Sequence, residues 1–107
     1  MQVTIKATKL ELNDDIKDYV QEKMDKLEKF LGTIPVENCD VELEKIAGVQ
    51  NSGNIFRAEV NLVLPRELLR VEKTTDDLNK AIDKVEDHLA EMIKKYKEKM
   101  IDKKRGK

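Results

Sequence analysis

Few residues of this chain have side chains suited to catalysis. One histidine, His88, and one cysteine, Cys39, occur among the 107 residues, and they fall in different predicted elements. The sequence contains no glycine-rich phosphate loop, paired metal-ligand cluster or nucleophile–base pair. Strand alternation predicts that Cys39 is a small buried hydrophobe, and His88 has no partner one helical turn away that would suit a metal. We therefore predict no enzyme activity, catalytic residue, metal, cofactor or small-molecule substrate.

Lysines are the other chemically suggestive residues, because rows of ammonium groups bind nucleic-acid phosphates without reading the base sequence. At about 100° per residue, Lys84, His88, Lys95 and Lys99 share one flank of a predicted helix, which Glu91 interrupts. The candidate RNA-binding set adds nearby lysines of both predicted helices: Lys26, Lys29, Lys80, Lys84, His88, Lys94, Lys95, Lys97 and Lys99. The alternative is a solvated lysine face. Aromatic residues are few and lie on apolar faces, which favours folded RNA over single strands.

Charge is distributed unevenly along the chain. Residues 94–107 hold eight basic and two acidic residues, a net of 8 − 2 = +6, within a chain whose formal net charge is −1. This pattern suggests a nucleic acid or another acidic partner for the end of the chain, with helix-dipole complementarity as the plainer alternative. We find neither an apolar stretch of membrane-spanning length nor a signal-peptide pattern, and the single cysteine fits a reducing compartment. We therefore predict a cytoplasmic location without membrane contact.

A small α+β fold must position these residues. Apolar residues at every second position predict strands over 2–8, 36–45, 55–64 and 67–73. Apolar steps of three and four predict a helix over 13–31 and a second helix from 74 or 75 onward. The second helix extends for about 28 residues, or ~42 Å, which is longer than strands of ~20 Å can cover.

Local signals mark the ends of these elements. Asn13 is the expected cap of the first helix, Gly32 its end, and Thr74 or Thr75 the cap of the second helix. Turn residues over 47–54 predict a loop. The outward-facing strand glutamates are expected to pair with basic neighbours rather than to act as acid and base. The glutamates are Glu42, Glu44, Glu59 and Glu72, and the basic neighbours are Lys6, Arg57 and Arg70.

The order β-α-β-β-β-α predicts a two-layer α+β sandwich. Its four-stranded, largely antiparallel sheet carries both helices on one face, as in a double-stranded RNA-binding domain, and leaves the other face wet. We assign residues 1–101 to a single domain and residues 102–107 to a basic frayed tail.

Four segments, in order, resemble the ribosome hibernation-promoting factors, also called ribosome-associated inhibitors: MQVTIKATKLELND, IKDYVQEKMDKLEKF, FRAEVNL and TTDDLNKAIDKVEDHL. The resemblance extends from Met1 to about Lys99 and is to the short form of the family. It implies a stress-induced protein that binds the small ribosomal subunit in the channel for messenger and transfer RNA. It further implies that basic residues of both helices contact ribosomal RNA, that translation stops, and that idle ribosomes are protected. We also expect a monomer off the ribosome.

The chain departs from the family pattern at several positions, among them Met92 and a longer loop over 47–54. Asn79 stands where an aromatic residue is usual, and His88 and Glu91 stand where the resemblance implies positively charged RNA contacts. Two alternative functions remain. One is a general double-stranded RNA-binding module, against which the Thr-Asp-Asp start of the second helix counts, because phosphates would require lysines there. The other is a protein–protein adaptor that uses the charged sheet face or the basic tail.

Overall fold

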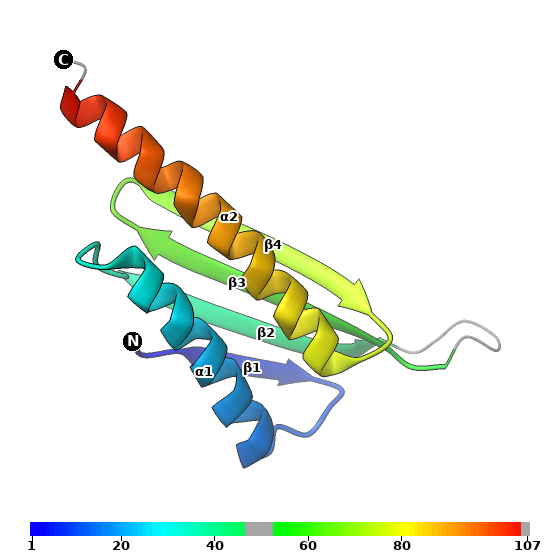
Figure 1. Cartoon of the computed structure of the whole chain (residues 1–107). Helices are drawn as coiled ribbons and strands as arrows, with labels where there is room; N and C mark the ends of the chain where they lie inside the picture. The colour runs from blue at the N-terminus through cyan, green and yellow to red at the C-terminus, as the bar shows by residue number, and fades with distance from the viewer. Residues whose placement is uncertain (47–52, 106–107) are drawn as a thin grey trace.

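The computed structural model describes residues 1–46 and 53–105. Within these ranges the elements occur in the predicted order (Figure 1): β1 (Thr4–Thr8), α1 (Asp14–Leu31), β2 (Asn38–Ile46), β3 (Ile55–Leu64), β4 (Glu67–Thr75) and α2 (Leu78–Arg105). The two helices lie side by side on one face of the sheet and leave the opposite face open (Figure 1). The predicted two-layer α+β sandwich is therefore confirmed.

The strands are arranged in the order β1-β2-β3-β4. β1 pairs in parallel with β2, with Ile5 opposite Val41, and the remaining pairs are antiparallel, with Val60 opposite Val71. A parallel pair requires a crossover between its strands, and α1 provides that crossover. α1 therefore lies over the β1–β2 half of the sheet, and α2 lies over the β3–β4 half (Figure 1).

The core lies between the sheet and the helices. Every second residue of the central strands is buried, including Val41, Leu43, Val60 and Leu62, and Cys39 is fully buried as predicted. Phe56 lies on the same inner face but is only half-buried, because it sits near the end of β3 opposite Thr75. The helices contribute apolar residues at steps of three and four: Val20, Met24, Leu27, Leu31, Ile82, Val85, Leu89, Ile93 and Tyr96.

The ends of α1 confirm the predicted signals. The Asn13 side chain accepts a hydrogen bond of 2.9 Å from the backbone N–H of Ile16, as an N-cap residue does. Gly32 has φ +67°, and its N–H donates to the carbonyls of Glu28 and Lys29. A side chain at that φ would be strained, which explains a glycine at this helix end.

The start of α2 differs from the prediction. β4 continues to Thr75, so both threonines expected to cap the helix belong to the strand. Asp77 takes that role: its Oδ1 accepts from the N–H of Lys80 at 3.2 Å, and its carbonyl accepts from Ala81. The Thr75 hydroxyl oxygen instead accepts from the N–H of Asp77 at 2.9 Å. The cap is therefore two residues after Thr75 and three after Thr74.

α2 has 28 residues, the predicted length, and projects past the sheet (Figure 1). Tyr96 marks the point of departure, because its hydroxyl donates to the carbonyl of Pro65 in the β3–β4 turn at 2.9 Å. The backbone is helical through Arg105, and the frayed tail over 102–107 stays a prediction. Residues 106–107, and the predicted loop at 47–54 except its last two residues, lie outside the described residues.

Candidate nucleic-acid interface

The open face of the sheet is organised around Arg57. Its guanidinium lies 2.6 Å from Glu42, 2.9 Å from both Glu44 and Glu59, and 3.7 Å from Glu72. The hydrogen bond from Arg57 holds the pKa of Glu42 below its ordinary value. The predicted pairing of these acids is confirmed, together with weaker pairs made by Lys6 and Arg70. The acidic residues named here outnumber the basic ones, which disfavours phosphate on this face.

The two helices are joined by a polar seam. The Tyr19 hydroxyl donates to Asp83, and the Lys23 ammonium lies 3.3 Å from Asp83 and 3.6 Å from Glu86. The hydrogen bond to Asp83 raises the pKa of Tyr19. Lys23 also lies 5.1 Å from the centre of the Tyr19 ring. This seam identifies the flank of α2 that faces α1 and fixes the spacing of the helices.

The predicted basic row of α2 lies on the opposite flank. The Lys99 ammonium is 3.4 Å from Glu67 of β4, and Lys84 and His88 line a shallow hollow of about 350 Å³ with Lys73, Asp87 and Glu91. The row therefore faces β4, away from α1. Lys73 was not among the predicted residues. The strand alternation that buries Leu69 and Val71 also places Lys73 on the helix side, so the sequence did contain that signal.

The lysines of α1 do not join this row. Lys26 and Lys29 are exposed on α1, whereas Lys84 and Lys99 lie on the flank of α2 that faces β4. Lys94 and Lys80 are also exposed on α2, although Lys80 lies 3.8 Å from Asp76. The candidate residues thus lie on both helices, and Asp83 and Glu86 of the seam stand between the lysines of α1 and the row of α2.

Lys97 differs from the other candidates, because its ammonium already has partners within the chain. It donates a 2.7 Å hydrogen bond to the carbonyl of Phe30 and lies 5.0 Å from the centre of the Phe30 ring. This contact ties the projecting end of α2 to the end of α1. Among the described residues, by contrast, we find no ion pair for the ammonium groups of Lys26, Lys29, Lys84, Lys94 and Lys95.

The remaining reactive groups have structural surroundings. Burial raises the pKa of the Cys39 thiol to about 12, so the nucleophilic thiolate is suppressed. His88 is exposed. Within residues 1–46 and 53–105 there is no cluster of three or more groups able to hold a metal ion. Neither described helix is long and apolar enough to cross a membrane.

Comparisons with known proteins agree with this architecture. Residues 3–101 match the protein family described as Sigma 54 modulation protein / S30EA ribosomal protein. A ribosome hibernation promotion factor of Staphylococcus aureus (strain COL) is 31% identical over 93 residues, which is 87% of this chain but 46% of that protein. The chain therefore spans about half the length of that relative.

Solved structures show the same fold. The Protein Y N-terminal domain of Thermus thermophilus superposes with a TM-score of 0.76 at 32% identity, covering 90% of this chain and 99% of that one. A ribosomal subunit interface protein of Coxiella burnetii has a TM-score of 0.70 at 17% identity, covering 91% and 98% respectively. The family match over most of the chain, supported by these relatives, shows that this protein belongs to the Sigma 54 modulation protein / S30EA ribosomal protein family.

Proposed function

We propose that this protein is a ribosome hibernation factor that acts in the cytoplasm. It binds the small ribosomal subunit through ribosomal RNA in the channel for messenger and transfer RNA, inhibits translation, and protects idle ribosomes under stress. The observation that carries this proposal is the match over residues 3–101 to a family of ribosome-associated factors rather than of enzymes. The name of the Staphylococcus aureus relative, ribosome hibernation promotion factor, supports the same role.

The physical basis of binding is the charge of the helical layer. Exposed ammonium groups on α1 and α2, including Lys26, Lys29, Lys94 and Lys95, attract phosphates and release counterions. They contact backbone rather than base edges, so the protein recognises the shape of folded RNA. A domain that occupies the channel in this way excludes the messenger and transfer RNA that would otherwise fill it.

The open face of the sheet supports one orientation on RNA. Its carboxylates, gathered around Arg57, face away from the helical layer. Phosphates are repelled by that face and attracted by the opposite one. The protein therefore turns its helices toward RNA and its sheet away from it.

The test is co-sedimentation of the protein with small ribosomal subunits over a series of salt concentrations. Two variants carry the same change in net charge: Lys94→Gln with Lys95→Gln in the helical layer, and Lys6→Gln with Arg70→Gln on the open sheet face. The helical variant should bind more weakly, with a slope of log affinity against log salt that is shallower by about 0.7–0.9 for each phosphate that is no longer neutralised. The sheet variant should bind like the unmodified protein.

Three outcomes would contradict the proposal. The protein could remain unbound even at low salt, or both variants could lose affinity equally, which would show that only net charge matters. Tight binding to an isolated RNA duplex, measured by gel shift, would instead favour a general double-stranded RNA-binding module. The first turn of α2 holds a single lysine, Lys80, which lies 3.8 Å from Asp76 next to the Asp77 cap. Its charge is therefore offset at the place where such a module would present lysines to phosphates.

A further inference from the structure

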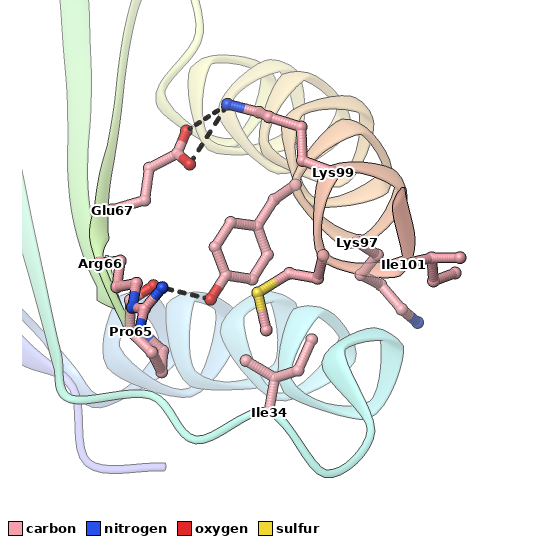
Figure 2. Close-up of a pocket in the computed structure, with 9 residues that line it drawn as sticks. Ile34, Pro65, Arg66, Glu67, Lys97, Lys99 and Ile101 are labelled. Atoms are coloured by element: carbon pink, nitrogen blue, oxygen red, sulfur yellow. Dashed lines mark hydrogen bonds and ion pairs between the residues drawn. The ribbon is translucent and has the colours of Figure 1, made fainter. Parts of the chain in front are cut away.

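An apolar hollow lies beneath the projecting end of α2 (Figure 2). It has a volume of about 630 Å³ and opens where the helix leaves the sheet. Ile34 follows α1, Pro65 and Arg66 form the β3–β4 turn, and α2 forms the roof with Met100 and Ile101. Met100 is 39% exposed and Ile101 is 50% exposed, although both belong to a helix that buries its apolar residues elsewhere.

Most polar groups around this hollow already have partners within the protein, whereas we find none for the Arg66 guanidinium among the described residues. The Tyr96 hydroxyl donates to the carbonyl of Pro65 at 2.9 Å, and Lys97 donates to Phe30. Lys99 lies 3.4 Å from Glu67 at the rim. A nucleobase placed here would find few groups for its polar edges, and burying those edges unpaired is costly. The floor instead suits aliphatic or aromatic side chains, which require only apolar contact.

Charge restricts the occupant further. Arg66, Lys97 and Lys99 surround the hollow, with Glu67 as the acidic member of the rim, and residues 94–107 carry a net charge of 8 − 2 = +6. A second copy of this chain that brought its own α2 end here would meet strong repulsion between like charges. A partner with carboxylates on both sides of an apolar anchor would be attracted.

We propose that this hollow binds an acidic peptide segment of a partner protein. One or two large apolar side chains of the peptide occupy the space between Ile34, Met100 and Ile101. Its carboxylates pair with Arg66 and are attracted by the remaining positive charge of Lys97 and Lys99 at the rim. This interaction goes beyond the proposed RNA contact and needs no ribosome. It can therefore be measured on the isolated protein, where a failure of the RNA proposal has no effect.

The experiment uses a fluorescein-labelled peptide of twelve residues, composed of Asp and Glu with one Phe and one Leu four positions apart. Its binding is followed by fluorescence anisotropy. Ile101→Ser removes apolar surface from the hollow without opening the core. Leu68→Ser is the matched control, because Leu68 is similarly exposed, at 53%, and lies on β4 at a position that alternates away from the helices.

We expect the peptide to bind the unmodified protein and the Leu68→Ser variant equally, and to bind Ile101→Ser about fivefold to tenfold more weakly. A peptide with Ser in place of Phe and Leu should bind no better than any polyanion, and its weak binding should disappear at high salt. Methyl resonances of Ile34 and Met100 should shift on titration with the apolar peptide.

Equal affinity for the apolar and serine peptides would overturn the proposal, since binding would then be charge attraction alone. Equal weakening by Ile101→Ser and Leu68→Ser would also overturn it. If a labelled oligouridylate displaced the peptide and itself bound Ile101→Ser more weakly than the unmodified protein, the hollow would be assigned to RNA instead.

Discussion

Lys97 offers a direct test of whether a basic residue serves RNA or the fold. Its ammonium is held by the Phe30 carbonyl at 2.7 Å and by the Phe30 ring at 5.0 Å. Lys94 is one turn earlier and is exposed. The substitutions Lys97→Gln and Lys94→Gln remove the same charge from the same region. We therefore expect Lys97→Gln to lower stability, and Lys94→Gln to lower phosphate binding.

The magnitude follows from the two contacts of Lys97. A hydrogen bond with a charged donor contributes about 1.5–3 kcal/mol when sheltered, and we take ~1 kcal/mol here because the contact is open to solvent. An exposed cation–π contact adds about 0.5–1 kcal/mol. Lys97→Gln should therefore cost about 1–2 kcal/mol, which corresponds to a fall in Tm of roughly 4–10 °C for a domain of this size. Lys94→Gln should change stability by less than about 0.5 kcal/mol.

Thermal unfolding followed by circular dichroism measures the first effect, and ribosome co-sedimentation over a salt series measures the second. Lys94→Gln should reduce the steepness of the salt dependence by about 0.7–0.9. Lys97→Gln should leave the salt dependence nearly unchanged, because the Lys97 ammonium is held by Phe30 and does not neutralise a phosphate. The reasoning is refuted if Lys97→Gln retains the original Tm, or if it flattens the salt dependence as much as Lys94→Gln does.

Three other predictions concern stability. Arg57→Met should lower the free energy of unfolding by about 1–3 kcal/mol in urea titration, because the strand glutamates would be left without their shared cation. The Arg70 side chain is 65% exposed, so Arg70→Met should cost under about 0.5 kcal/mol. Equal costs would contradict the shared-cation account. Asp77→Ala should lower the free energy of unfolding by about 1 kcal/mol, because it removes the helix cap, and Thr74→Ala should leave it nearly unchanged. The reverse ranking would indicate that the threonine caps the helix. The hydrogen bond to Glu28 raises the pKa of the Met1 ammonium above 8.0. This pair therefore stabilises the fold fully below pH 8.0, and Tm should fall as pH rises through the raised pKa. Glu28→Gln should reduce the fall in Tm, and an unchanged fall in Tm would show that other groups cause it.

The fold could be predicted because its signals are local and repeated. β3 has the predicted bounds, Ile55–Leu64, since alternation continues over the whole strand. Asn13 is the first of three good cap residues, before Asp14 and Asp15, and it caps α1, whereas Gly32 is the one glycine at the other end of that helix. The start of α2 offered several good caps in a row. Pairing with β3 decided among them, because Thr74 and Thr75 lie opposite Arg57 and Phe56.

The arrangement of the candidate site depends on contacts between residues far apart in sequence. Helical periodicity correctly placed Lys84, His88 and Lys99 on one flank, but it does not say which neighbour that flank faces. The seam between Tyr19 and Asp83 settles that question, and these residues are 64 positions apart. The contact of Lys97 with the Phe30 carbonyl spans 67 positions and likewise has no local signature.

α2 serves two surfaces because its two parts have different surroundings. Up to Tyr96 the helix covers the sheet, and its apolar stripe is buried at Leu89, Ile93 and Tyr96. Beyond Tyr96 no described strand lies beneath it, yet the stripe continues one turn further to Met100. A helix required only to cover the sheet would become polar at that point. The last turns of α2 instead carry an apolar side toward the hollow, and the exposed Lys94 and Lys95 precede Tyr96 and do not line it. An acidic peptide and an RNA backbone would therefore approach from different directions. The Lys97 contact with Phe30 holds the base of the projection against α1 and so gives both approaches a fixed geometry.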